Sequence, residues 1–413
     1  MRRKKVFLLA MTLVIVVSML VTSGLTNAKG KTLHVAQVAW GLDDIFFQTV
    51  QDGTKYELDR LSKKYGFTYT RDLLGDQKPE TQVKYLETLM AKKPDILVFC
   101  PVDSNLIGPV QQYNAENIPV ITNNVTIYGG KHTFVAFDNV IAGETTAKAM
   151  IRRLEKKYGK DPKTWAAAGG VIVELTGDWA MSIARDRSRG FHNIMDPIAK
   201  DTPGLQVVTE EGKWNSDIAY KKMADLITKY GDKIIATYTH DGTMSIGGVW
   251  PALVAAGKGY TIDNPKHIIM CCIDGTSPEL QMVREKKLDS VTIQPAWGEG
   301  EVVARLIHDI WTKGEKGIAK VGTTLYANEK RPLIMDLARN QFTKEEYNKG
   351  AKPVWAPVQV VAGKVPNGSW EGVWYKTNST MTCPDDYPAD SKILWGNFWP
   401  YLKTGKWPWQ NGK

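Results

Sequence analysis

Short runs of β-branched and apolar residues alternate with longer amphipathic segments from Thr32 onward. In the longer segments, apolar residues recur on one helical face, as Leu58, Leu61 and Tyr65 do at positions i, i+3 and i+7. The short runs predict strands at Leu33–Ala39, Phe67–Leu73, Asp95–Cys100, Ile118–Thr122 and Thr133–Ala136. The longer segments predict helices near Phe47–Tyr65, Pro79–Lys92 and Ser104–Glu116.

The same alternation then repeats along the chain. A second group of strands is expected at Gly170–Leu175, Leu205–Thr209, Lys233–Tyr238, Ile268–Ile273 and Ser290–Ile293. Helices are expected near Ala142–Tyr158, Ser182–Ile198, Ser216–Tyr230, Thr243–Ala256, Pro278–Lys287 and Glu299–Lys313.

The strand–helix–strand order predicts an α/β fold with parallel sheets covered by helices on both faces. Two groups of strands in a chain of 413 residues predict two similar lobes, since one compact core rarely grows that large. Ligands of such sheets bind beyond the carboxyl ends of the strands, so a cleft between the lobes is the expected site.

The alternation stops at about Asn340, and tryptophans then recur among Pro, Gly and Asn residues. These tryptophans are Trp355, Trp370, Trp374, Trp395, Trp399, Trp407 and Trp409. We expect this Trp-rich extension to pack on the second lobe and to contact no ligand. A surface that binds a partner protein is the alternative.

The amino-terminal end has the pattern of a secretory signal peptide. Basic residues at Arg2–Lys5 precede an apolar run over Val6–Val21, and small residues follow. We expect residues 1–28 to be removed by cleavage near Ala28. An uncleaved membrane anchor is the alternative, because the apolar run approaches the length that spans a bilayer.

Charge and cysteine content exclude some classes of protein. The formal net charge is +9, but the basic side chains are mixed with acidic ones and form no stripe, so no nucleic-acid partner is expected. Cys100, Cys271 and Cys272 end apolar runs and are expected to be buried. If any cysteine forms a disulfide, Cys383 is the candidate.

The chain contains no motif that indicates an enzyme. It lacks a Gly-x-Gly-x-x-Gly fingerprint, a phosphate-binding Gly-Lys-Ser/Thr loop and a Gly-x-Ser-x-Gly elbow. Its six histidines show no metal-ligand spacing. His240 beside Asp241 could form a dyad, but no motif supplies a nucleophile, so an ordinary cleft or surface histidine is expected. We therefore expect no catalysis, no cofactor and no metal.

Polar and aromatic residues gather just beyond the predicted strand ends. They include Trp40, Asp43, Asp44, Phe46, Phe47, Asn123, Asn124, Asp178, Trp179, Trp214, His240, Asp241, Asp274 and Gln294. Carboxylates and amides match hydroxyl groups, and flat rings cover the C–H faces of a pyranose. Any single member could instead serve a turn or a helix cap, as Asp274 could before Gly275 and Thr276. Their joint occurrence favours a binding site.

The order of short motifs from about Thr32 to Gly317 resembles that of the ribose/galactose-type periplasmic binding proteins of ABC transporters. The motifs are LDDIFF (Leu42–Phe47), PDILVFCPVDSN (Pro94–Asn105), NIPVITNN (Asn117–Asn124), FDN (Phe137–Asn139), ARDRSRGF (Ala184–Phe191), IDGT (Ile273–Thr276) and VTIQ (Val291–Gln294). The resemblance implies a type I fold: two Rossmann-like lobes that are joined by three crossings and close on a sugar.

The resemblance also implies a set of ligand-binding residues. In the first lobe these are Asp44, Phe46, Phe47 and Asn124, and in the second lobe Arg187, Trp214, Asp241, Asp274 and Gln294. The first two crossings are expected near Asp138 and Gln294, and the third after Leu325.

Three departures from the family pattern leave the identity of the sugar open. Val125 stands where the family often has Arg or Lys, and Asp241 replaces a usual Asn. Ile273 replaces an aromatic residue of ribose binders. The calcium loop of galactose binders is missing around Asp161, so the resemblance implies no metal.

These observations predict a division of the chain. We expect a signal peptide at 1–28, a first lobe from 29–138 and 295–328, a second lobe from 139–294 and 329–340, and an extension at 341–413. The predicted function is capture of a neutral monosaccharide or small sugar in the periplasm, by a monomer that delivers it to an ABC transporter permease in the inner membrane.

Other functions remain open on the sequence alone. The predicted site has three carboxylates and one cation, Arg187. This excess of negative charge would also suit a cationic amine or another small polar solute. A sensor-only binding protein is a further alternative. A transcription regulator with the same lobes would carry a DNA-binding helix-turn-helix where the apolar leader stands.

Overall fold

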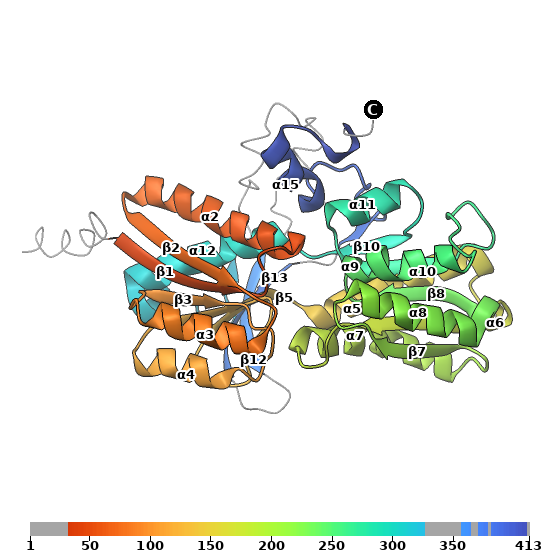
Figure 1. Ribbon diagram of the computed structural model, residues 1–413, viewed down its shortest axis with the longest axis horizontal. Coiled ribbons are helices and arrows are strands. Elements are labelled where there is room, and N and C mark those ends of the chain that lie inside the picture. The colour runs from red at the N-terminus through yellow and green to blue at the C-terminus, as the bar shows by residue number, and fades with distance from the viewer. Residues whose placement is uncertain (1–31, 327–356, 365–370, 379–380, 411–413) are drawn as a thin grey trace, which may run out of the picture.

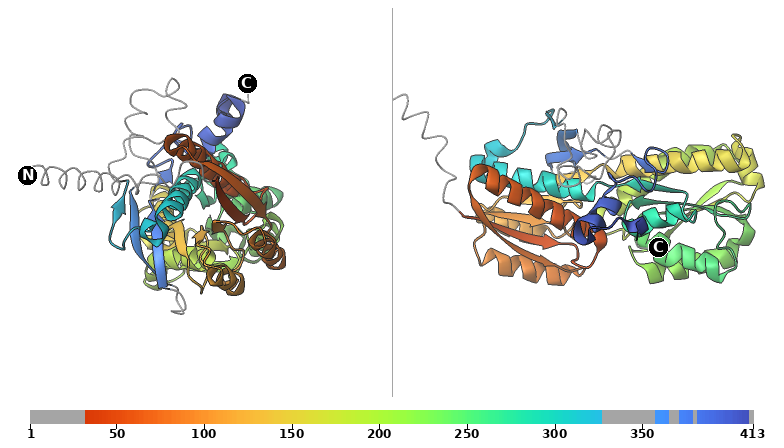
Figure 2. Two further views of the ribbon diagram at one scale, coloured as in Figure 1. Left: turned by 90° about the vertical axis from the view of Figure 1, so that its left-hand side faces the viewer. Right: turned by 90° about the horizontal axis from the view of Figure 1, so that it is seen from above.

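The computed structural model describes residues 32–326, 357–364, 371–378 and 381–410. These residues form two α/β lobes side by side, each built on a central sheet with helices on its faces (Figures 1 and 2). The predicted fold class of two lobes with mostly parallel sheets is confirmed. The expected signal peptide at 1–28 and the expected second-lobe segment at 329–340 lie outside the described residues.

The first lobe is built on a sheet with eight strands in the described part of the chain, in the order β11-β12-β13-β5-β4-β3-β1-β2. Its strands are β1 (Thr32–Ala39), β2 (Thr68–Gly75), β3 (Ile96–Phe99), β4 (Val120–Asn123), β5 (Thr133–Phe137), β11 (Thr324–Leu325), β12 (Val358–Lys364) and β13 (Glu371–Thr377). Its helices are α2 (Ile45–Tyr65), α3 (Pro79–Met90), α4 (Ile107–Ala115) and α12 (Ala296–Lys313).

The second lobe has six described strands in the order β14-β10-β9-β8-β6-β7. These are β6 (Val171–Thr176), β7 (Gln206–Glu211), β8 (Ile234–Thr239), β9 (Ile269–Asp274), β10 (Ser290–Ile293) and β14 (Thr382–Cys383). The helices are α5 (Asn139–Tyr158), α6 (Pro162–Ala167), α7 (Ser182–Lys200), α8 (Ser216–Tyr230), α9 (Gly242–Met244), α10 (Trp250–Ala255) and α11 (Ser277–Arg284), with a π-helical turn at Ser245–Val249.

Alternation along β1 explains how the first sheet buries both faces. Leu33 and Val35 pack with α2 and α12, whereas Ala36 and Val38 pack with α3 and α4 on the opposite side. Such a sheet, covered on both faces, needs the near-continuous apolar strands that the sequence contains.

The Trp-rich extension does more than pack on the second lobe. Strand β13 pairs in parallel with β5, and β12 pairs antiparallel with β13, so both extend the sheet of the first lobe. Strand β14 pairs antiparallel with β10 in the second lobe. Helix α15 (Trp395–Thr404) follows. The expectation of an extension on the second lobe alone is wrong, because backbone pairing with distant strands leaves no local signal in the sequence.

The described part of the chain passes between the two lobes three times. The first lies between β5 and α5, and the second between β10 and α12, close to the expected positions at Asp138 and Gln294. The third was expected after Leu325. The next described strand, β12, returns to the same sheet, and the described chain passes to the second sheet between Thr377 and Thr382.

The cysteines are buried thiols. Cys100, Cys271 and Cys272 are buried as expected, and Cys383 is also free and buried, on β14. The candidate disulfide is therefore absent. Among the described helices, none combines the length and the apolar character needed to cross a bilayer.

Candidate functional site

A cavity lies between the two lobes, beyond the carboxyl ends of strands from both sheets. The empty space between its walls, part of which is open to solvent, is about 380 Å³. The walls are formed by Trp40, Asp44, Phe46, Phe47, Asn124, Met181, Ile183, Arg187, Trp214, Asp241, Asp274 and Gln294. All nine residues that the sequence placed in the site are among them.

The wall of the first lobe is mainly aromatic. Asp44 Oδ1 accepts the backbone N–H of Phe47 at 3.0 Å, which caps α2 and fixes the carboxylate at the helix start. The Phe46 and Phe47 rings meet edge to face with centroids 5.2 Å apart, and Trp40 stacks on Phe47 at 5.3 Å. The cap and the rings together present flat apolar faces beside one carboxylate.

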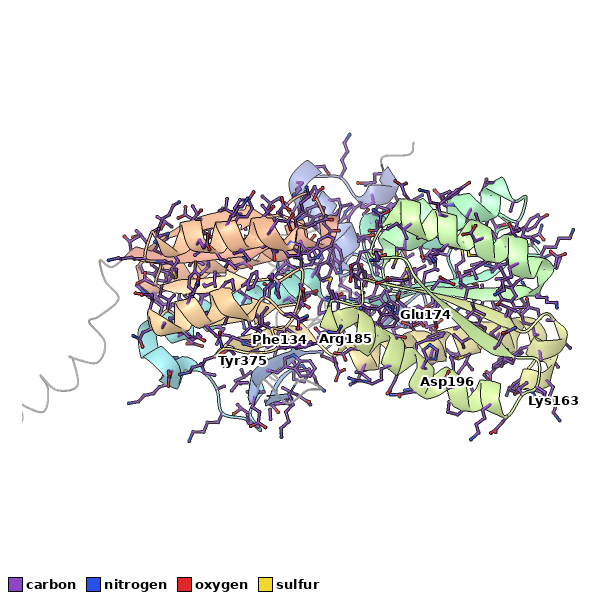
Figure 3. All side chains as sticks on the ribbon, turned by 60° about the horizontal axis from the view of Figure 1, so that its bottom comes forward. Phe134, Lys163, Glu174, Arg185, Asp196 and Tyr375 are labelled. Atoms are coloured by element: carbon purple, nitrogen blue, oxygen red, sulfur yellow. The ribbon has the colours of Figure 1, made fainter. Side chains whose placement is uncertain are left out.

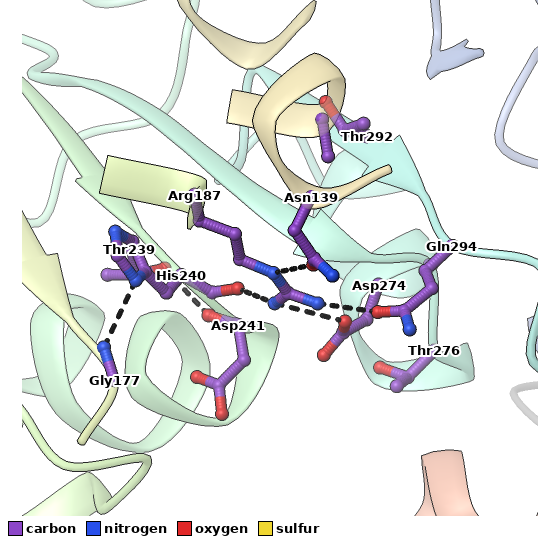
Figure 4. A network of polar contacts seen from close by, with 12 residues as sticks. Asn139, Gly177, Arg187, Thr239, His240, Asp241, Asp274, Thr276, Thr292 and Gln294 are labelled. Atoms are coloured by element: carbon purple, nitrogen blue, oxygen red, sulfur yellow. Dashed lines mark hydrogen bonds and ion pairs between the residues drawn. The ribbon is translucent and has the colours of Figure 1, made fainter. Parts of the chain in front are cut away.

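Arg187 on α7 organises the wall of the second lobe (Figure 4). Its Nε donates to Asn139 Oδ1 at 2.9 Å, and Nη2 donates to Gln294 Oε1 at 2.6 Å. Nη1 donates to the backbone oxygen of His240 and lies 3.6 Å from Asp274 Oδ1. The guanidinium is buried and held on every side, so it offers a fixed positive charge to the cavity.

Trp214 lies over the glycine at position 177. A Cβ on Gly177 would approach the indole ring to 1.8 Å, so a side chain there would displace Trp214. The indole N–H donates to the sulfur of Met181 at 3.0 Å. The guanidinium carbon of Arg187 lies 5.6 Å from the ring centroid, a cation–π distance.

Three of the predicted residues have unusual backbones. Asn124 and Trp214 have φ of 64° and 58°, and Asp274 has φ of 134°. Side-chain-bearing residues rarely adopt such values, and strained positions of this kind concentrate at ligand sites.

Carboxylates outnumber cations in the cavity walls. Burial raises the pKa of Asp44, and it raises the pKa of Asp241 to about 6. Burial also raises the pKa of Asp274, which the charge of Arg187 opposes and the carboxylate of Glu279 reinforces. The cavity therefore favours ligands that donate hydrogen bonds or carry positive charge.

His240 belongs to a buried network behind the cavity. Its Nε2 lies 2.9 Å from Glu174 Oε1, and its Nδ1 accepts the N–H of Gly177 at 3.1 Å. The second oxygen of Glu174 lies 2.9 Å from His192 Nε2. The expectation of a cleft or surface histidine is wrong, since His240 is fully buried. Asp241 does not pair with it, but accepts the N–H of Met244 at 2.9 Å and caps α9.

Three lining residues lay outside the predicted set. Trp40 directly follows β1 and stood in the polar and aromatic cluster of the sequence. Met181 and Ile183 are apolar and flank the first residue of α7, so they carry no signal that separates them from core residues.

The lobes also touch each other beside the cavity. The N–H of Ser182 donates to Ser104 Oγ at 3.3 Å, and Arg185 donates to the hydroxyl of Tyr128. Figure 3 shows Arg185 at the junction of the two lobes. Since Ser104 and Tyr128 belong to the first lobe, the structure holds the two walls together.

The described residues contain no group of three or more His, Cys, Asp or Glu side chains that could hold a metal ion.

A comparison with protein-family models gives a match to the periplasmic binding protein domain over residues 35–316. The match covers more than half of the chain and includes both walls of the cavity. The chain belongs to the periplasmic binding protein family. Proteins of this family are non-catalytic solute-binding proteins, in agreement with the missing enzyme motifs.

This periplasmic binding protein has relatives of known name. It is 28% identical to the ribose import binding protein of Bacillus subtilis over 272 residues, which cover 65% of this chain and 78% of that protein. It is 25% identical to the ribose import binding protein of Escherichia coli over 318 residues, which cover 76% of this chain and 93% of that protein.

Solved structures of the same fold include an ABC transporter solute-binding protein from Bacillus halodurans with bound myo-inositol. It superposes with a TM-score of 0.57 at 22% identity, covering 70% of this chain and 91% of that one. A galactofuranose-binding protein superposes with a TM-score of 0.56 at 20% identity. The superposition covers 68% of this chain and 89% of that one. The Trp-rich extension lies beyond the matched domain.

Proposed function

We propose that the protein captures a neutral monosaccharide or other small sugar in the periplasm and delivers it to the permease of an ABC transporter. The observation that carries this proposal is the cavity between the lobes. Its first wall is aromatic, and its second wall holds carboxylates, an amide and a fixed guanidinium. This combination suits a ring with C–H faces and a rim of hydroxyl groups.

The names of the relatives support the same class of ligand. Two of them are ribose import binding proteins, and the related structures hold or are named for myo-inositol, D-allose, D-fucose and galactofuranose. All of these compounds are small and carry several hydroxyl groups. From these relatives we infer two properties of this chain: the class of ligand, and the partnership with an inner-membrane permease.

We assign the nine cavity residues as the ligand contacts. Asp44 and Asn124 would bond hydroxyl groups from the first lobe, and Arg187, Asp241, Asp274 and Gln294 from the second. Phe46, Phe47 and Trp214 would cover the faces of the ring. We also propose that residues 1–28 direct export and are removed near Ala28.

A cationic amine is the second candidate, on one specific observation. Asp44, Asp241 and Asp274 line the cavity, and Arg187 is the one cation among the described lining residues. An ammonium group on the ligand would offset this excess of negative charge.

A thermal-shift screen separates the two candidates. Pentoses, hexoses, polyols, disaccharides and amines would each be added to the purified protein. A ligand at a hundredfold excess over its Kd stabilises the native state by about 2.7 kcal/mol, so the correct class raises the melting temperature clearly. We expect a neutral monosaccharide or polyol to give the largest shift. A shift with amines alone would replace the sugar proposal with the amine.

A further inference from the structure

Helix α15, in the extension beyond the matched domain, is fastened to the backbone of the binding site. The indole N–H of Trp395 donates to the backbone oxygen of Gln294 at 2.6 Å and lies 3.2 Å from that of Asp274. Gly396 packs on the same loop, where a Cβ would approach the oxygen of Gly275 to 2.2 Å. Trp395 thus lies behind the cavity wall, and its ring also meets that of Phe46 in the first lobe edge to face, with centroids 5.9 Å apart.

Other contacts anchor this helix on the second lobe. It packs on α11. The side chain of Asn397 donates to the backbone oxygens of Ala389 and Ser391 at 2.9 and 2.8 Å, and Arg284 on α11 donates to Asn397 Oδ1 at 3.2 Å. Asn397 is fully buried, so its bonds fix the orientation of α15 relative to α11.

The opposite face of α15 contacts the first lobe. Trp399 Nε1 donates to Asp52 Oδ2 on α2 at 2.9 Å, and Lys403 Nζ lies 3.3 Å from the same oxygen. The ring of Phe398 meets that of Trp297 on α12 edge to face, with centroids 5.8 Å apart. In Figures 1 and 2 the helix lies between α2 and α11, across the gap between the lobes.

We propose that α15 is a strap that completes the binding site, with two separable roles. Trp395 positions the backbone of Asp274 and Gln294, and the contact of Trp399 with Asp52 favours the closed arrangement of the lobes. The strap contacts both lobes, but it is none of the three places where the described chain passes from one lobe to the other. Hinge opening would therefore separate α15 from α2, while α15 stays with the second lobe.

The energetic argument follows from population shift. A contact made only in the closed arrangement raises the closed fraction of the empty protein. The apparent Kd equals the intrinsic Kd divided by the fraction of binding-competent protein. Loss of the contact therefore weakens binding without changing any group that touches the ligand.

The positioning role rests on the backbone of Asp274. Its φ of 134° is unfavourable, and its backbone oxygen accepts the N–H of Gln294 at 3.0 Å as well as facing the Trp395 indole. A strained backbone persists only where its surroundings hold it. Trp395 is the part of those surroundings that the extension supplies.

The strap is tested first with Asp52→Ala in the full-length protein. Asp52 is 40% exposed on a helix, so the variant should fold. We expect a larger radius of gyration of the empty protein by solution scattering. Affinity for D-ribose or myo-inositol should fall about threefold to tenfold by titration calorimetry. Trp399→Phe removes the indole N–H that donates to Asp52. It should likewise increase the radius of the empty protein and lower the affinity.

Asp59→Ala is the matched control on the same helix. Asp59 is 43% exposed and bonds to Lys55 and Tyr69 within the first lobe. Asp59→Ala should leave both the radius of gyration and the affinity unchanged. If Asp52→Ala and Trp399→Phe also leave the empty radius unchanged, the closing role of the strap is wrong, whichever ligand binds.

The positioning role has its own readout. Trp395→Phe should speed hydrogen exchange at the Gln294 amide and weaken binding. Trp165→Phe is its control, since Trp165 also donates to a backbone oxygen, that of Gly159 at 2.8 Å, within the second lobe. Equal exchange at Gln294 in both variants would overturn this role.

The choice of ligand is the one part of the test that rests on the proposed function. If the wild-type protein binds neither D-ribose nor myo-inositol, those two sugars are excluded as ligands. The scattering and exchange measurements on the empty protein still decide the strap.

Discussion

The carboxylate of Asp274 combines a strained backbone, a buried position and one cationic neighbour. The alternative that Asp274 caps the following helix is wrong, because Thr276 caps α11 in a capping box with Glu279. Burial raises the pKa of Asp274, and the nearby Glu279 carboxylate adds to the shift. A side chain held at such a cost to folding is expected where binding uses it.

Asp274→Asn should therefore weaken ligand binding without unfolding the protein. The amide keeps the shape but loses charge-assisted bonds, a loss of about 1.5–3 kcal/mol, or roughly tenfold to a hundredfold in Kd. The melting temperature without ligand should stay level or rise, because a buried negative charge is removed. Titration calorimetry beside a melting curve measures both. Asp263→Asn, at an exposed residue of the same lobe, is the control, and equal affinities of the two variants would refute the assignment.

The Glu174 network supports the same wall from behind. Burial acts to raise the pKa of Glu174, but bonds with His192 and His240 outweigh it and lower the pKa to about 2. The bond to Glu174 raises the pKa of His192 to about 9, although partial burial opposes it. His192 is therefore an imidazolium over a wide pH range, whereas burial lowers the pKa of His240.

This network predicts how stability depends on pH. The folded-state pKa of His192 lies above its unfolded value of about 6.5, so its contribution is complete below that value and is lost as pH rises through about 9. His192→Gln should lower the melting temperature most near pH 6 and least near pH 10. Melting curves of both proteins across this range measure the difference. A constant difference would mean that His192 contributes by packing and not by charge.

At the scale of elements, the strands and helices of the two lobes were largely predictable, because each has a local pattern. Ser216–Tyr230 and Ser290–Ile293 begin and end where the sequence predicted. The segment predicted as one helix at Thr243–Ala256 is instead α9, a π-helical turn and α10. Periodicity detects apolar faces but does not detect a change of helical pitch.

The extension was predicted poorly for a different physical reason. The partners of β13, β14 and α15 are residues of β5, β10 and α2 that lie far away in the sequence, so no periodicity within the extension reveals them. Eight of the nine candidate site residues follow strands whose order is regular, so the sequence could bring them together, whereas Arg187 lies inside α7 and was named only through the family resemblance. The role of Trp395 could not, because its partners are backbone oxygens, which every residue has.

At the scale of the whole molecule, the cavity is divided between two bodies. Its aromatic wall belongs to the first lobe and its Arg187 network to the second. Direct contacts between the lobes include polar ones, such as the bond between Ser182 and Ser104, and one apolar cluster also holds residues of both lobes. A ligand that touches both walls would therefore shift the lobes toward the closed arrangement by its own contacts.

Solution scattering should detect this closure. At a saturating concentration of the ligand found by thermal shift, we expect the radius of gyration to fall relative to the empty protein. Asp274→Asn should show less compaction at the same ligand concentration, because fewer molecules are occupied. An unchanged radius at saturation, with binding verified by calorimetry, would argue against a hinge.

The place of β13 has a consequence for how the protein is made. Its partner β5 lies before the second lobe in the sequence, and β13 lies after it. Three of the eight described strands of the first sheet, β11 to β13, therefore cannot join β5 until nearly the whole chain has been synthesised. Until then β5 is an open edge with unpaired backbone groups and apolar side chains, a template for pairing with a neighbouring chain. A chain truncated after Lys313 by premature termination would keep that edge permanently and would be prone to aggregate.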